Sequence, residues 1–390
     1  MKKSKQNNQT ALAALTASAM ALPAFQTQAA TAPTENVVSY RSSNYSEDNV
    51  PASSVATGST DRYDIDIQQL SLLAPVGKNF SLKFDALTEK LSGASPLGTQ
   101  QGPDGKPQLV MSGASGTGIK EDRDDYSAHG TYYGDGYSTG LTYGQSTEND
   151  YKATYYGVDW EVEFNNKNTA FQIAVSQSDD KLSPTDAVLY GRVQSAEKET
   201  QSISIGLSQV ISKTKIIQFG LSATEDSGYL SDPYKTSDLR PSTRNRVTAT
   251  TRYRSFSNSS NAAMHLDYRY YSDDWEVTSH TLGFAWHQNM GSSFVLIPSL
   301  RYYTQTEASF YEPYQTAGNT NPYYSSDYRL SPYGAISAGL KFVHSFQHFS
   351  YTASIERYES SGDYSFDKVA VEHPGLVNFT RITIGFDVKF

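Results

Sequence analysis

Residues 381–390, RITIGFDVKF, decide the fold. Apolar side chains occupy every second position of this stretch, and Arg, Thr, Gly, Asp and Lys occupy the positions between them. The apolar set is Ile382, Ile384, Phe386, Val388 and Phe390. A period of two is that of a β-strand with one apolar and one polar face. The printed sequence therefore finishes on an amphipathic strand.

The same alternation recurs along the chain, and runs with helical periodicity are hard to find. Clear examples are 80–86, 156–164, 217–223, 282–287 and 336–342. These segments run about 10–15 residues, longer than typical soluble strands and long enough to cross a bilayer when tilted. Their polar faces carry long charged side chains, which require water. The water-filled lumen of a barrel provides it, and the apolar faces then meet lipid.

The connections between these strands alternate between short and long, as in outer-membrane barrels with short periplasmic turns. We expect extracellular loops at 91–118, 179–196, 226–243, 308–328 and 359–375. With 37–45 as the first strand, the count is about sixteen, and fourteen is the alternative. The alternation slips at Gln68–Gln69, which we interpret as a β-bulge. The fold class is all-β: a transmembrane, antiparallel, up-and-down barrel.

The first thirty residues read as an export signal. Three lysines precede an apolar run at 11–22, and Ala29 and Ala30 offer small residues for cleavage. We therefore predict a signal peptide at 1–30 and a barrel at 31–390. The chain has no cysteine, which excludes a disulfide framework. Its net charge of −9 argues against nucleic acid as a partner.

The location follows from these observations. The strand at 381–390 is similar to the terminal strand of proteins inserted by the outer-membrane barrel assembly machinery, and Phe386, Val388 and Phe390 would be the assembly signal. We predict the Gram-negative outer membrane as the location, after cleavage of the signal peptide. The expected partners are outer-membrane lipid, the assembly machinery and small solutes.

The sequence offers no pattern of catalytic chemistry. Ser115 lies in GASGT, and Thr117 breaks the G-x-S-x-G pattern of a nucleophile elbow. The run at 121–125, EDRDD, carries carboxylates of the kind that Ca²⁺ prefers. Its spacing is not that of an EF-hand loop, and we favour a solvated rim above the bilayer. We expect no enzyme activity and no metal site.

One tetrapeptide, Ser-Gly-Ala-Ser, occurs at 92–95 and again at 112–115. With DALTEKLSGASP at 85–96, IKEDR at 119–123 and STENDY at 146–151, it gives a resemblance to Gram-negative outer-membrane barrels with a domain of unknown function and paired SGAS motifs. The resemblance implies an exported barrel and no assigned activity.

Barrels of this kind also resemble targets of periplasmic FMN transferases, which join FMN through a phosphoester to a Ser or Thr hydroxyl. The target has an acidic residue three positions before Ser/Thr-Gly-Ala-Thr/Ser. Glu89 takes the acidic place for the first copy, so Ser95 is the better candidate acceptor, and Ser115 is the poorer one because its copy has no acidic residue. Covalent FMN and a periplasmic FMN transferase are thus a possible cofactor and partner, and a structural loop is the alternative.

The function that we expect is a porin-like channel or transport barrel for small solutes. Strand parity places a mixed set of charges in the lumen: Asp159, Glu161, Glu163, Arg252, Arg254, Asp267, Arg269 and Arg301. The alternatives are a redox accessory barrel, either flavinylated or docking periplasmic electron carriers, and a structural or adhesive surface barrel.

Overall fold

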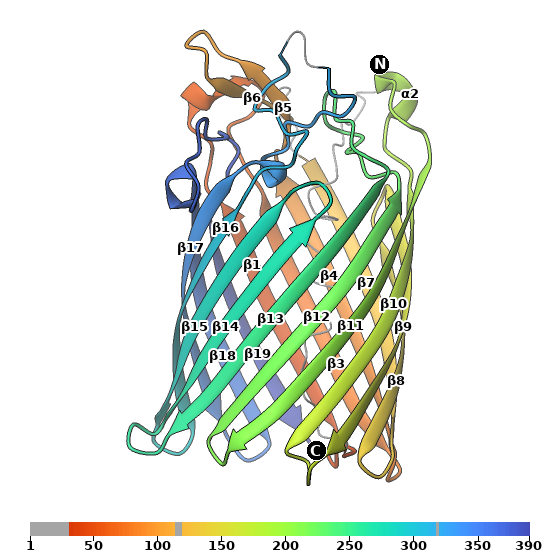
Figure 1. The fold of residues 1–390 in the computed structure, drawn as a ribbon, viewed down its shortest axis with the longest axis vertical. Helices are drawn as coiled ribbons and strands as arrows, with labels where there is room; N and C mark the ends of the chain where they lie inside the picture. The colour runs from red at the N-terminus through yellow and green to blue at the C-terminus, as the bar shows by residue number, and fades with distance from the viewer. Residues whose placement is uncertain (1–30, 114–118, 317–319) are drawn as a thin grey trace.

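The computed structural model describes residues 31–113, 119–316 and 320–390, and these residues form a closed barrel (Figure 1). The first and last strands pair antiparallel, from Val37 opposite Lys389 to Glu47 opposite Phe379, and so close the barrel. The sixteen strands of the barrel, in chain order, are β1 (Val37–Glu47), β3 (Asp64–Val76), β4 (Phe80–Gly93), β7 (Ile119–Tyr133), β8 (Tyr137–Thr147), β9 (Tyr151–Phe164), β10 (Thr169–Leu182), β11 (Ala196–Ser212), β12 (Lys215–Gly228), β13 (Thr243–Ser257), β14 (Ala262–Asp273), β15 (Thr278–Met290), β16 (Phe294–Gln305), β17 (Tyr333–Ser345), β18 (Phe349–Ser361) and β19 (Phe379–Lys389). The all-β class, the sixteen strands and the early first strand are confirmed.

The remaining elements are short and lie in the loops. They are η1 (Ala52–Ser54), β2 (Val55–Thr57), β5 (Pro96–Gln101), β6 (Pro107–Met111), α2 (Ala187–Tyr190), η2 (Tyr328–Leu330) and η3 (Gly362–Tyr364). β2, β6 and β5 form a separate three-stranded sheet. Among the described residues, no helix has the length and apolar character needed to cross a membrane.

The outer face of the barrel is apolar and exposed. Leu141, Ile384 and Leu300 are 65%, 59% and 58% exposed. Each lies at an outward position between polar residues that point into the lumen, as the alternation predicts. Apolar surface of this extent is unfavourable in water, whereas a bilayer covers it.

The two ends of the barrel differ (Figure 1). One end has only tight turns, at 77–79, 134–136, 165–168, 213–214, 258–261, 291–293 and 346–348. The other end carries the long connections 48–63, 94–118, 183–195, 229–242, 306–332 and 362–378, and two brief ones at 148–150 and 274–277. Four strands therefore extend three or four residues past the expected starts of the loops that follow them. The loop at 306–332 is longer than expected, and 48–63 is an additional long loop. In outer-membrane barrels the tight turns are periplasmic and the long loops extracellular.

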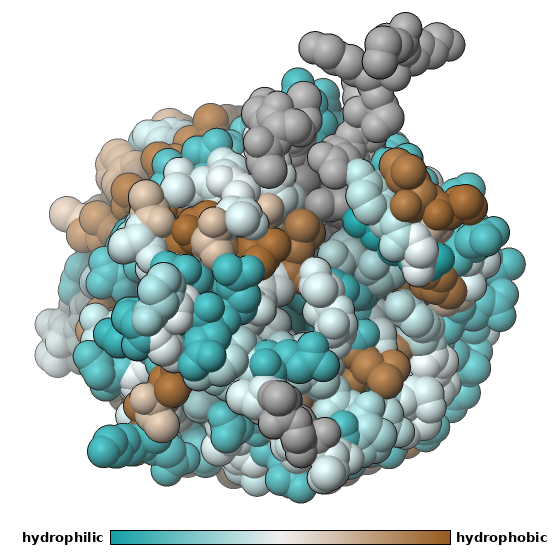
Figure 2. All heavy atoms as spheres, turned by 90° about the horizontal axis from the view of Figure 1, so that it is seen from above, coloured by the Kyte–Doolittle hydropathy of each residue, from teal (hydrophilic) through white to brown (hydrophobic). Residues whose placement is uncertain are grey.

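The long loops fold inward over their end of the barrel. Seen from above, loop side chains cover much of the mouth (Figure 2). The small sheet packs there, with Leu109 of β6 fully buried against Val50, Ala94 and Met111. The mouth is therefore a packed structure of several loops and has its own small apolar cores.

The predicted bulge at Gln68–Gln69 is wrong. β3 pairs with β1 and with β4 in continuous register through both residues. Apolar and polar side chains exchange faces here, because packed loops surround the inner face and the outer face lies beyond the lipid-covered band. At this height the inward Ile65 packs with Tyr63 and Leu91 beneath the loops, while the outward Gln68 donates a hydrogen bond to Ser42 above the apolar band.

Candidate functional site

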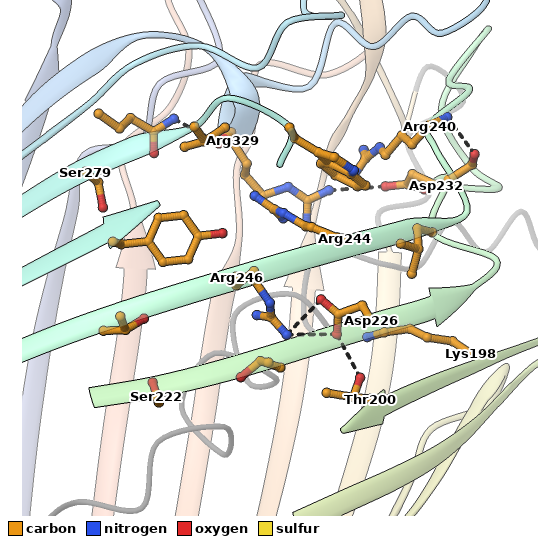
Figure 3. A pocket seen from close by; sticks show the side chains of 18 of the residues that line it. Lys198, Thr200, Ser222, Asp226, Asp232, Arg240, Arg244, Arg246, Ser279 and Arg329 are labelled. Atoms are coloured by element: carbon orange, nitrogen blue, oxygen red, sulfur yellow. Dashed lines mark hydrogen bonds and ion pairs between the residues drawn. The ribbon is translucent and has the colours of Figure 1, made fainter. Parts of the chain in front are cut away.

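A cavity of about 440 Å³ lies on the inner wall of the barrel, directly beneath the loops (Figure 3). Its walls come from β9 to β16 and from the loops that cover them. Two of its lining residues are acidic, Asp226 and Asp232. The basic lining residues are more numerous: Lys198, Arg240, Arg244, Arg246, Arg269, Arg301 and Arg329. The cavity is therefore strongly basic, and its volume is in the range of small-molecule sites.

Strand parity positions the basic side chains of the wall. Arg244 and Arg246 occupy alternate positions of β13, which puts both on its inner face. Arg269 of β14 and Arg301 of β16 also line the cavity. Sequence reasoning found Arg269 and Arg301 but missed Arg244 and Arg246, although both share the parity of Arg252 and Arg254. Extending the alternation of β13 back to its first residues would have placed Arg244 and Arg246 on the inner face.

Most of these cations have a carboxylate partner. Arg246 pairs with Asp226 at 2.7 Å and Arg244 with Asp273, with Nε 2.8 Å from Oδ2. Lys198 lies 3.6 Å from Asp180. Within the described part of the chain, Arg269 and Arg301 form no ion pair, and the Nε of Arg269 is buried without a hydrogen-bond partner. These two guanidinium groups carry the uncompensated positive charge of the cavity.

Aromatic side chains frame the same space. Tyr271 and Tyr303 line it, and the Tyr303 ring lies 5.6 Å from the ring of Tyr333. The Arg244 guanidinium lies over Trp275, 4.3 Å from the ring centroid. Trp275 belongs in turn to an apolar cluster with Phe310. The wall is thus rigid around the arginines, because each large ring packs against another element.

The other predicted lumen residues have separate surroundings. Arg254 pairs with Asp267 at 2.7 Å, so these two charges compensate each other. The pairing register places Arg252 directly opposite Asp267. Nearer the tight turns, Asp159 lies 3.8 Å from His129 and Glu163 3.5 Å from Lys167. Glu161 is only 4% exposed. The structure therefore separates the predicted set into three groups: Arg269 and Arg301 in the basic cavity, a mixed group of Arg252, Arg254 and Asp267, and an acidic stretch of β9.

A second group of carboxylates lines the barrel on the side that faces the arginines. In the barrel order, β4, β7 and β8 lie across from β14, β15 and β16. Arg123 is 4% exposed and contacts Glu89 at 3.2 Å, Asp125 at 3.6 Å and Glu148 at 3.7 Å. The run 121–125 splits between the two faces, as its parity predicts, but its inward members are buried and do not form a solvated rim.

Sequence reasoning missed two members of this acidic group, Glu148 and Asp150 in the brief loop 148–150. Their carboxylates lie within 4.8 Å of each other and of Glu121. Burial, opposed by the nearby Arg123, raises the pKa of Glu148 to about 7. Burial also raises the pKa of Asp150 to about 6. Proximity in the fold brings these residues together, and no sequence spacing signals it.

Asp327 contacts three basic residues in the loops that cover the cavity. It is fully buried and pairs with Arg329 and, at 2.9 Å, with Arg240. Lys235 lies 4.0 Å away and donates to the carbonyl of Pro96 in the small sheet. Three loops, 94–118, 229–242 and 306–332, are joined by this one carboxylate and its cations. We call these four charged residues, Lys235, Arg240, Asp327 and Arg329, the mouth network.

One protein family matches residues 12–378, and its description is "Protein of unknown function (DUF3570)". The match covers nearly the whole chain. The chain belongs to the DUF3570 family. No curated protein sequence matches this DUF3570 barrel.

Solved structures share its fold. A bacterial polysaccharide outer membrane secretin has a TM-score of 0.50 and 10% identity, over 91% of this chain and 98% of that one. CdiB from Acinetobacter baumannii has a TM-score of 0.53 and 6% identity, over 92% of this chain and 60% of CdiB. At these identities the likeness shows the fold alone: that of a Gram-negative outer-membrane β-barrel.

In the DUF3570 barrel, the first tetrapeptide and the described part of the second, Ser112 and Gly113, form a structural unit. Ser95 accepts from the backbone N–H of Ser112 at 2.9 Å, and the Ser112 hydroxyl accepts from the N–H of Ser95 at 2.9 Å. The glycines, Gly93 and Gly113, have φ of 123° and 83°, which a residue with a Cβ adopts only with strain. Ser95 and Ser112 thus join the two ends of the segment that contains β5 and β6.

This geometry bears on the predicted flavin acceptors. The Ser95 hydroxyl forms a hydrogen bond with the buried Tyr63, and Ala94 beside it is 1% exposed. Ser95 itself is half-buried, so a transferase would reach its hydroxyl more readily before the loops pack. Ser115 lies outside the described residues. Attachment of FMN at either serine stays a prediction.

A buried histidine, His373, lies in the long loop 362–378 at the mouth. His373 is 1% exposed; its Nε2 lies 2.9 Å from the carbonyl of Ser326, and its Nδ1 accepts from the N–H of Gly375 at 2.9 Å. Burial lowers the pKa of His373 from 6.5 to about 4. Its contribution to loop stability is present in full above pH 6.5 and falls as the pH decreases from 6.5 toward 4, because the unfolded loop takes up the proton first.

We expect the loop at 362–378 to lose about 2 kcal/mol of stability between pH 7 and pH 5. Hydrogen-exchange protection factors of the Gly375 amide measure this, and they should fall about 30-fold. His373→Gln, which can donate to Ser326 and does not titrate, is the control. Equal pH responses of the two proteins would contradict the assignment to His373.

Proposed function

We propose that this DUF3570 barrel is an outer-membrane channel that admits small polar solutes. The observation that carries the proposal is the basic cavity beneath the loops, which continues the polar inner face of a closed sixteen-stranded barrel. Barrels of this size have a lumen wide enough for water unless loops fill it. The outer membrane, its lipid and the barrel assembly machinery are the location and partners that fit this fold.

The inner wall below the loops carries small residues as well as charged ones. Inward positions near the middle of several strands hold Gly or Ala, among them Gly157, Ala174, Gly220 and Gly283. The loops narrow the opposite end, since the mouth network and the small sheet pack over it. We therefore expect a channel of low conductance whose narrowest part lies at the mouth.

Planar-bilayer recording tests the proposal. The purified, folded protein should produce discrete current steps in 1 M KCl that scale with salt concentration. Shifted gel mobility before and after boiling verifies that the inserted protein is a folded barrel. A folded barrel that inserts into the bilayer and never conducts would remove the channel proposal.

A further inference from the structure

Arg269 and Arg301 differ from the other arginines of the cavity. Within the described part of the chain neither has a carboxylate partner, whereas Arg240, Arg244, Arg246 and Arg329 each have one. Arg301 is exposed to the lumen, and Arg269 is half-buried with its Nε lacking a hydrogen-bond partner. The two therefore present free guanidinium donors to whatever enters the cavity.

The nearby carboxylates are engaged elsewhere. Asp226 accepts from Thr200 at 2.8 Å as well as from Arg246. Asp273 accepts from Tyr271 at 2.6 Å besides its pair with Arg244. Asp267 pairs with Arg254 at 2.7 Å. Each of these carboxylates already has a partner, so none forms an ion pair with Arg269 or Arg301. The two arginines therefore keep a net positive charge on the cavity wall.

The acidic wall across the lumen does not cancel this charge. Glu89, Asp125 and Glu148 are 6%, 7% and 6% exposed, and all three contact Arg123. A solute in the lumen therefore does not touch them, but it does touch the exposed Arg301. Charge contacts within a narrow, partly dehydrated cavity are stronger than in open water.

We infer that the solute admitted by this channel is a small anion with carboxylate or phosphate oxygens, held in passage by Arg269 and Arg301. The inference rests on the channel function proposed above. A guanidinium group presents planar N–H donors that match two oxygens of a carboxylate or phosphate. Binding such an anion provides an acceptor for the unpartnered Nε of Arg269 and reduces the repulsion between the two arginines.

Ion selectivity tests whether Arg269 and Arg301 make the channel prefer anions. In a tenfold KCl gradient, the wild-type reversal potential should indicate a chloride-to-potassium permeability ratio above 1. The double variant Arg269→Glu/Arg301→Glu should bring this ratio below 1, and Arg269→Gln/Arg301→Gln serves the same purpose if the glutamates prevent folding. Arg357→Glu changes charge on the outer face of β18, where Arg357 pairs with Asp48, and should leave the ratio unchanged.

Binding tests the site independently of conduction. Titration calorimetry with malonate and with inorganic phosphate should show one site on the folded barrel in detergent. Arg269→Lys/Arg301→Lys keeps the charge but lacks the planar donors, so anion preference should persist while malonate affinity falls about tenfold.

The two proposals fail in different ways. No conductance together with malonate binding that is lost in the glutamine variant would reject the channel and keep the anion site. Conductance without anion preference, or malonate binding that is unchanged in the glutamine variant, would overturn the anion inference and leave the channel in place.

Discussion

Asp327→Asn is expected to open the mouth of the barrel and raise its conductance severalfold. The substitution leaves Arg329, Arg240 and Lys235 without their shared negative charge at a fully buried position. Removing one partner of a buried ion pair costs about 3–5 kcal/mol. The loops 229–242 and 306–332 should then separate, because the mouth network joins them.

Single-channel recording in planar bilayers measures this effect. Asp367→Asn, at an exposed position of the loop 362–378, removes the same charge and should conduct as wild type does. Conductance of Asp327→Asn equal to that of wild type would show that the network does not restrict the mouth.

The network should also differ from His373 in its response to acid. Burial by itself would raise the pKa of Asp327, but Arg329, Lys235 and Arg240 hold it well below its ordinary range. The stability that Asp327 provides is thus present above the ordinary pKa of a carboxyl group and is lost only as the pH falls through that depressed value. Mild acid should loosen the loop that carries His373 and leave the mouth network intact.

Ile384→Arg is expected to destabilise the barrel by about 2–4 kcal/mol, the cost of a basic residue at the centre of the lipid face. Ile384 lies midway along β19, is 59% exposed, and sits in the strand that closes the barrel against β1. The matched control is Thr383→Arg. Thr383 points into the lumen, where its hydroxyl lies 2.8 Å from that of Ser43, and a charge there remains in water.

Urea unfolding of both variants in lipid vesicles gives the comparison. Ile384→Arg should unfold at much lower urea concentration than Thr383→Arg, whose loss is limited to about 1 kcal/mol for one hydrogen bond. Equal loss in both variants would contradict the assignment of lipid-facing and lumen-facing residues. Whether Phe386, Val388 and Phe390 also act as an assembly signal stays a prediction.

The barrel could be predicted from sequence because one rule, alternation, governs most of the chain. Side chains that face the bilayer must be apolar, whereas those that face the lumen can be polar. Ile382 and Ile384 therefore identify the outer face without knowledge of any partner strand. The rule failed at Ile65 and Gln68, where the packed loops make the interior apolar. The predicted bulge at Gln68–Gln69 mistook this change of surroundings for a shift in strand pairing.

The candidate site was only partly predictable for a related reason. Arg269 and Arg301 follow from strand parity, but their lack of partners depends on where Asp226 and Asp273 point. Asp327 and Arg240 lie in loops without periodicity and 87 residues apart. Such contacts are set by tertiary packing, which a single sequence does not display.

The mouth network also fixes an order of events during folding. Apart from the pair Asp327–Arg329, which lie two residues apart, its contacts join loops that the barrel strands must first bring together. Contacts between distant segments form late, after the chain entropy of the intervening loops has been lost. The mouth should therefore close last, on a barrel already sealed by β1 and β19. A newly inserted chain would pass through a wider, unobstructed form before it matures, and this short-lived form is the one in which Ser95 is most accessible to another protein.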